Sequence, residues 1–340
     1  MSNTSRNATR IESIEWLRGI ASLGICIVHI FFTLNYFDSQ DVFYQRYFRY
    51  FQEMGRFWVP MFFVISGFII TYSLDKKSYS LKAYPVFWIR RIIRIQIPYI
   101  ASLVIAMGSL YIYSVVSAKE TPSLNSKNLL LNAVYGNVFL DSPWINPVAW
   151  TLFIEIQFYT LIGLIVPFIR GNKVIHTLTL WLVLLTCLRF AVYEGTERFL
   201  PFYFDVFMAG ILSFKRYRGL ISCSSFAIQM GIVLALIAMI HGKAYALAST
   251  LAVLVILPNY QIPLKSLYRL GQLSYSLYLI HWTLGVEILR NWFTLTYPAS
   301  GPVLKSLAGL SILGVCLAFA ALFYQCIEKP AIALARRVVP

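Results

Sequence analysis

Titratable side chains inside apolar segments are the residues of this sequence that point most directly to chemistry. His29 follows Arg18 by eleven residues, and Arg18 lies in the run EWLRG over residues 15–19. In a helix, eleven residues make close to three turns and about 16 Å, roughly half the hydrocarbon core of a bilayer. Arg18 and His29 are therefore predicted to share a helix face, with His29 near the middle of the membrane. A structural alternative is that Arg18 reaches out to lipid headgroups while His29 hydrogen-bonds to a neighbouring carbonyl group.

Two further titratable residues lie at a similar predicted depth. Glu155 is nine residues into an apolar segment that starts at Asn146, and His281 is ten residues beyond Gly271. These separations correspond to about 13 Å and about 15 Å along a helix. Ionisable groups at membrane depth are costly and usually functional. His29, Glu155 and His281, on three different helices, therefore predict one polar chamber and are its candidate catalytic residues. Its further lining is predicted to include Ser66, Trp150, Tyr159 and Tyr278.

An arginine cluster precedes the third long apolar segment. Arg90, Arg91 and Arg94 are three or four residues apart, so they are neighbours on a helix surface. We place them at a helix start on the cytoplasmic side, about half a bilayer from Glu155. Guanidinium groups near a helix N-terminus suit bidentate phosphate binding. Anchoring of the helix to anionic lipid explains the same cluster equally well, and the sequence leaves both interpretations open.

The composition indicates which elements position these residues. Of the 340 residues, 59% are hydrophobic and 13% are charged, whereas a soluble domain averages about 45–50% apolar and about 25% charged residues. The predicted fold is an all-α integral membrane protein with about ten transmembrane helices, forming a single domain over residues 1–340. The predicted spans are 14–34, 57–74, 92–116, 146–169, 176–193, 199–214, 221–240, 244–258, 271–289 and 303–326.

The distribution of basic residues predicts the orientation in the membrane. With a cytoplasmic N-terminus, 19 of the 29 Lys and Arg residues fall in inner segments, as the excess of positive charge on the cytoplasmic side requires. Both termini are then cytoplasmic. The formal net charge of +15 does not indicate nucleic-acid binding, because the sequence has neither zinc-ligand spacing nor a basic stripe on a soluble helix.

Other patterns carry less information. The five cysteines show no paired spacing, and no metal-binding motif, G-x-S-x-G, H-E-x-x-H or P-loop sequence occurs. Asp205 is interpreted either as a partner of Arg189 or as part of the chamber, and its role stays open. His176 and His241 are expected to be solvated at span ends.

Six motifs in order along the chain resemble the acyltransferase-3 family of integral membrane acyltransferases, which includes bacterial O-acetyltransferases of surface polysaccharides. They are EWLRG at 15–19 with His29 eleven residues after Arg18, FFVISGF at 62–68, RRxxRIxxPY at 90–99, WTLxxExxFY at 150–159, SYSxYLxH at 274–281, and EKP at 328–330. Each motif alone is weak, but six in family order are specific.

The resemblance implies transfer of an acyl group, usually acetyl, from cytoplasmic acyl-CoA to a hydroxyl group of a glycan, either a polysaccharide or a lipid-linked oligosaccharide such as that of lipopolysaccharide O-antigen. It implies a bacterial inner-membrane protein with no bound cofactor, whose partners are acyl-CoA, the glycan and the lipid bilayer. Arg18, Arg90, Arg91 and Arg94 would bind acyl-CoA, with Arg18, Arg91 and Arg94 at positions of the family pattern. His29 would be the general base, since an imidazole titrates near neutral pH. Glu155 would orient His29 or stabilise its protonated form.

Three other classes of protein are alternatives to an acyltransferase. A transporter or flippase would use titratable residues at mid-membrane as a proton relay, but it favours inverted repeats, which the sequence does not show. A glycosyltransferase with a lipid-linked donor tends to need an acidic metal-binding pair. A structural scaffold leaves the three titratable groups unexplained. The sequence does not identify the sugar, the acyl chain, the oligomeric state, or whether transfer is direct or passes through an acyl-enzyme.

Overall fold

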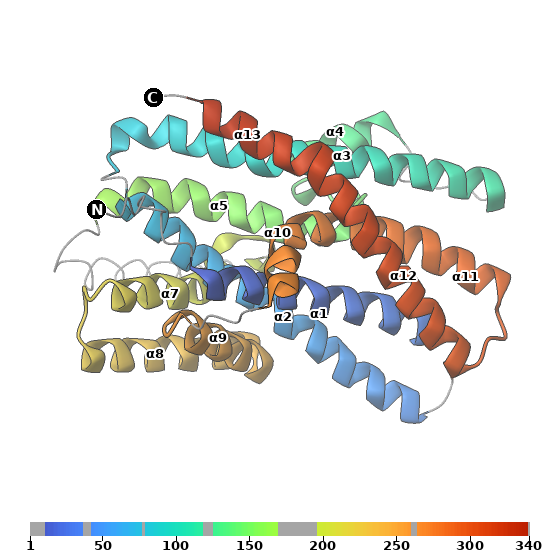
Figure 1. Ribbon diagram of the computed structural model, residues 1–340, viewed down its shortest axis with the longest axis horizontal. Coiled ribbons are helices and arrows are strands. Elements are labelled where there is room, and N and C mark those ends of the chain that lie inside the picture. Colours follow the sequence, from blue (N-terminus) through green and yellow to red (C-terminus); the bar gives the residue numbers. More distant parts are fainter. Residues whose placement is uncertain are drawn as a thin grey trace, which may run out of the picture.

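The computed structural model describes residues 11–36, 42–76, 79–117, 125–168, 196–259 and 264–338, and these residues form helices joined by short connections, without a strand (Figure 1). The main α-helices are α1 (Glu12–Tyr36), α2 (Val42–Lys76), α3 (Tyr84–Ser117), α4 (Ser126–Ala133), α5 (Trp150–Ile165), α7 (Leu200–Tyr217), α8 (Cys223–His241), α9 (Lys243–Ile256), α10 (Lys265–Ile280), α11 (Asn291–Thr296), α12 (Pro302–Phe323) and α13 (Lys329–Arg337). Two π-helices, His281–Arg290 and Tyr324–Glu328, connect α10 to α11 and α12 to α13. Short 3-10 helices cover Leu81–Ala83, Gly136–Val138, Pro147–Ala149, Val166–Phe168 and Thr196–Arg198.

Within the described residues, six helical segments are long and apolar enough to cross a membrane: Glu12–Leu34, Phe57–Asp75, Leu81–Ile112, Pro147–Ile165, Cys223–His241 and Pro302–Arg337. They confirm six of the predicted spans and a multi-pass membrane protein. The predicted span 244–258 coincides with a shorter apolar helix, Lys243–Ile256, while 199–214 and 271–289 coincide with α7 and with α10 and its π-helix. The predicted span 176–193, with His176 and Arg189, lies outside the described residues. The count of ten and the cytoplasmic termini stay predictions.

The start of α3 differs from the prediction. The helix begins at Tyr84, with Pro85 in its first turn, a position where the missing N–H of proline is not needed. Arg91 and Arg94 are therefore two to three turns inside the helix, not at its N-terminus, and their backbone N–H groups are not available to a ligand. Any phosphate binding by these residues must use the guanidinium groups.

Close approaches of helix backbones bring the site residues together. A Cβ atom added at Gly271 of α10 would lie 2.0 Å from the carbonyl oxygen of Glu15 on α1, and one at Gly67 of α2 would lie 2.2 Å from that of Phe207 on α7. Small residues at such crossings allow membrane helices to pack with their backbones in contact. The contact at Gly271 fixes α1 against α10, the two helices that carry Arg18, His29 and, just beyond the end of α10, His281.

Candidate functional site

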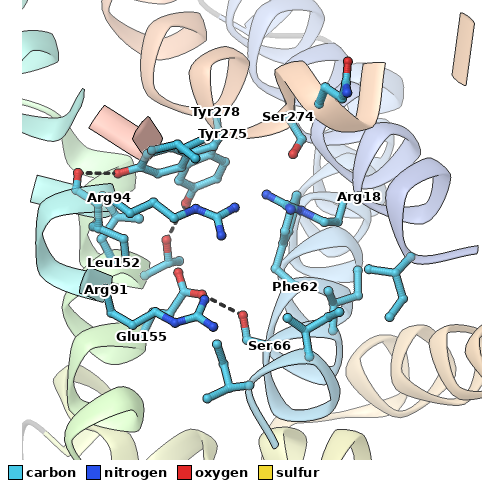
Figure 2. Close-up of a pocket in the computed structure, with 18 of the residues that line it drawn as sticks. Arg18, Phe62, Ser66, Arg91, Arg94, Leu152, Glu155, Ser274, Tyr275 and Tyr278 are labelled. Carbon is cyan, nitrogen blue, oxygen red and sulfur yellow. Dashed lines mark hydrogen bonds between the residues drawn. The ribbon is translucent and has the colours of Figure 1, made fainter. Parts of the chain in front are cut away.

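A cavity of about 600 Å³ lies among α1, α2, α3, α5, α10 and α13 (Figure 2). Its lining includes five cationic side chains and two acidic ones, an excess of three positive charges. The cations are Arg18, Arg91, Arg94, Lys329 and Arg336, and the acids are Glu15 and Glu155. Such a volume is typical of a small-molecule site, and the charge favours an anionic ligand.

Three of the predicted arginines face this cavity from two sides. Arg18 projects from α1 and Arg94 from α3, and Figure 2 shows their side chains directed toward each other across the space. The guanidinium carbon of Arg91 lies 5.5 Å from the ring centroid of Tyr159 and 5.8 Å from that of Phe87. Stacking on aromatic rings leaves the edge of a guanidinium group available for hydrogen bonds to an anion.

Glu155 belongs to this cavity. Its Oε1 atom accepts hydrogen bonds from Ser66 Oγ at 2.7 Å and from the Tyr159 hydroxyl at 2.5 Å. Because Glu155 and Arg91 line the same cavity, the predicted separation of half a bilayer between Glu155 and the arginines is wrong. Glu155 is hydrogen-bonded to Ser66 and Tyr159, and through Tyr159 it is linked to Arg91.

His29 and His281 contact each other and do not line this cavity. The distance from His29 Nδ1 to His281 Nε2 is 2.9 Å, and the two rings are stacked at 5.2 Å between centroids. His281 is fully buried, and its Nδ1 lies 3.2 Å from the carbonyl oxygen of Leu277. A carbonyl only accepts, so Nδ1 of His281 carries the proton, and its Nε2, in the neutral ring, is an acceptor. His29 Nδ1 is then the donor, which leaves an unprotonated Nε2 on His29.

The Tyr278 side chain lies between the cavity and the histidine pair and forms a partition between them. Neither histidine lines the cavity, whereas Phe62 and Tyr278 do. The ring of Tyr278 lies 5.8 Å from that of His281 and 6.0 Å from that of Phe62. The Tyr278 hydroxyl group is held by Thr151 Oγ1 at 2.7 Å and donates to the Val148 carbonyl at 2.8 Å. The single predicted chamber is therefore two adjoining sites that share the Tyr278 side chain, with Phe62 packed beside it.

The other predicted residues divide in the same way. Ser66, Tyr159 and Tyr278 line the cavity, but Trp150 does not and packs instead against Tyr203, with 5.5 Å between ring centroids. Arg90 also points elsewhere, because its Nε and Nη2 atoms donate to the carbonyl oxygen of Val338, at 3.0 and 2.6 Å.

Asp205, whose role was open, faces His241. The distance from Asp205 Oδ1 to His241 Nε2 is 3.1 Å, and both side chains are buried. The prediction of a solvated His241 is therefore wrong. His241 is buried because its ring is also stacked on those of Tyr203 and Tyr245. This pair joins α7 to the end of α8.

Sequence reasoning missed the contribution of α13. Lys329, Ile332, Ala333 and Arg336 all line the cavity. Lys329 is followed by the other three at three, four and seven residues, which is the spacing of one helix face. This spacing is the sequence feature that could have predicted their common role. Within the described residues, no group of three or more His, Cys, Asp or Glu side chains is placed to hold a metal ion.

Comparison with known protein families places the chain in one of them. Residues 11–325 match the acyltransferase 3 family model, described as an acyltransferase domain. The match spans most of the chain and includes α1 to α12, so the chain belongs to this family of acyltransferases. A search of curated proteins found no match, and neither did a search of solved structures.

Proposed function

From membership of the acyltransferase 3 family and the geometry of the cavity, we propose that the chain is an O-acyltransferase of the bacterial inner membrane, folded as one domain over residues 1–340. It takes an acyl group, acetyl in the simplest case, from cytoplasmic acyl-CoA and transfers it to a hydroxyl group of a cell-surface or lipid-linked glycan. The donor is a substrate, and no resident cofactor takes part.

The observation that carries this proposal is the cationic cavity. Arg18, Arg91 and Arg94 converge on a space of about 600 Å³, and arginine is the side chain best suited to bidentate contacts with phosphate groups. The nucleotide end of acyl-CoA supplies such phosphates. A transporter for protons or small cations would not be served by a cavity with an excess of positive charge.

The hydrogen-bond order of the histidine pair supports His29 as the general base. With Nδ1 of His29 donating to His281, the free Nε2 is able to take the proton of an acceptor hydroxyl group as its oxygen attacks the thioester carbon. The carbon–sulfur bond then breaks, and the proton returns from His29 to the thiolate of CoA. His281 is a positioning residue in this scheme, because it fixes the tautomer and the ring orientation of His29.

The partition sets a condition on the reaction. In this scheme the thioester passes Tyr278 to reach His29, so the Tyr278 side chain moves when the donor is bound. Glu155 acts on the donor side, where it holds Tyr159 under the guanidinium group of Arg91.

The proposal is tested with purified protein in lipid nanodiscs. Binding of radiolabelled acetyl-CoA is measured first, and the label is then followed into a glycan fraction from cells that lack the protein. We expect saturable binding and a mass increase of one acetyl group on a sugar. The His29→Ala variant should bind the donor but not transfer it. Absence of acetyl-CoA binding by the wild-type protein would refute the proposal and favour a transporter or flippase.

A further inference from the structure

Two cations of α13 stand at the mouth of the cavity. Lys329 and Arg336 both line it and are both exposed, whereas Arg18, Arg91 and Arg94 line it and are partly buried. Lys329 and Arg336 are seven residues apart, two helical turns and about 10 Å along the axis. The cavity therefore has an inner group of three arginines and an outer pair of cations on a different helix.

The structure fixes α13 at both of its ends. At the start, Glu328 is buried and its Oε2 atom accepts a hydrogen bond from Ser276 Oγ of α10 at 2.6 Å. At the end, Arg90 of α3 donates two hydrogen bonds to the Val338 carbonyl. The helix packs along α3, which carries Arg91 and Arg94 (Figure 1). The outer cations are thus held at a set position relative to the inner arginines.

The length of the last helical segment also sets α13 apart. Helix α12, its π-helix and α13 run continuously over Pro302–Arg337, 36 residues, or about 54 Å. This length exceeds a hydrocarbon core of about 30 Å. At least one end of such a segment lies outside the core, and the exposed charges of Lys329, Arg336 and Arg337 favour the α13 end.

We propose that Lys329 and Arg336 form a binding site for a phosphate monoester, the 3′-phosphate on the adenosine ribose of acyl-CoA, while the inner arginines hold its diphosphate. This inference rests on the proposed function and deepens it. A phosphate monoester carries about two negative charges at neutral pH, and the site offers two cations. The thioester end of a donor bound in this order points inward, toward the partition at Tyr278.

The alternative source of the same chemistry is the phosphate of a lipid headgroup, since a cationic helix at a membrane surface attracts anionic lipid. The chain offers a matched control for this alternative. Arg337 is on the same helix next to Arg336 and is also exposed, but it does not line the cavity. A lipid-anchoring role would involve Arg337 as much as its neighbour.

The test compares acetyl-CoA with 3′-dephospho-acetyl-CoA as donors. Dissociation constants are measured for the wild-type protein, the K329Q/R336Q double variant and the R337Q control, each in nanodiscs of zwitterionic lipid and again with anionic lipid added. In both lipids we expect the double variant to bind acetyl-CoA about tenfold more weakly, which is the combined effect expected from the loss of two exposed ion pairs. For the dephospho donor, the wild type and the double variant should bind equally, and R337Q should match the wild type with both donors.

Equal weakening of both donors, or no weakening of either, would overturn the inference while leaving the proposed function intact. The same holds if R337Q reproduces the double variant, because that result assigns the cations to lipid. Thermal unfolding in the same nanodiscs checks that the double variant is folded, and its binding of the dephospho donor provides a second check. Failure of the wild-type protein to bind acetyl-CoA would reject the inference together with the proposed function.

Discussion

His281 offers a direct test of the tautomer argument. Phe in its place keeps an aromatic ring but has no acceptor for the N–H group at Nδ1 of His29. Gln in its place carries an amide oxygen close to where Nε2 of His281 lies, so it preserves the acceptor. We therefore expect His281→Phe to lower kcat for acyl transfer and His281→Gln to restore most of it.

The size of the effect follows from the 2.9 Å contact between His29 Nδ1 and His281 Nε2 and from the complete burial of His281. A donor left without a partner in a buried site costs about 1–3 kcal/mol. If that cost appears as loss of the productive orientation of His29, kcat falls by about 5- to 150-fold. The KM for acetyl-CoA should change little, because His281 does not line the cationic cavity.

The assay is steady-state transfer of radiolabelled acetyl from acetyl-CoA to the glycan in nanodiscs, with donor binding measured separately. Unchanged kcat in His281→Phe would show that His281 does not position His29. Equal losses in the Phe and Gln variants would show that its role is not that of a hydrogen-bond acceptor. A rise in KM without a change in kcat would place His281 on the donor path instead.

Three further changes probe the cavity and its support. Replacing Arg91 and Arg94 together by Lys keeps the charge but removes the planar guanidinium groups and their paired donors. The affinity for acetyl-CoA should therefore fall, while the membrane topology, measured by cysteine labelling, is unchanged. An unaltered affinity would favour a role of the two arginines in anchoring the helix to lipid. Glu155→Gln removes a negative charge from the cavity proposed to bind the anionic donor, so acetyl-CoA should bind severalfold more tightly, an effect of up to about 1 kcal/mol. Equal affinity in titration calorimetry would show that the charge of Glu155 does not affect donor binding. Gly271→Ala places a Cβ atom 2.0 Å from the Glu15 carbonyl oxygen and should destabilise the packing of α1 on α10 by about 1–3 kcal/mol, seen as a lower Tm in detergent. As a control, a Cβ atom at Gly314 meets no atom within 4 Å, so Gly314→Ala should leave Tm unchanged.

Helical periodicity and hydropathy account for what was predicted correctly. Six spans follow from apolar length alone. The rise per residue predicts a similar depth for His29 and His281, and the structure places these two side chains in contact. The membrane environment makes such predictions effective, because a span must satisfy its backbone groups as a helix.

The position of Glu155 shows what counting residues along a span leaves undetermined. A position along the helix gives depth, but the neighbours of a side chain depend on which way α5 is rotated and on which helices surround it. Glu155 faces Ser66 and the arginine cavity rather than the histidine pair. Lys329 and Arg336 were missed for a different reason. Their sequence predicts a basic cytoplasmic end, and only the packing of α13 against α3 brings it over the cavity.

The closed partition is consistent with catalysis by a membrane acyltransferase that must keep a thioester away from water. Tyr278 is held by two hydrogen bonds, to Thr151 and to the Val148 carbonyl, and each is worth about 0.5–1.5 kcal/mol. If the proposed opening breaks both, it costs about 1–3 kcal/mol, which corresponds to an open form populated at about 1–15% without a donor. Contacts between the donor and the arginines can offset that cost, since a ligand that fits only the open form shifts the equilibrium by its difference in affinity. In the proposed scheme the closed position of Tyr278 screens His29 from the cavity, so that His29 would not activate water against a thioester that is only partly bound.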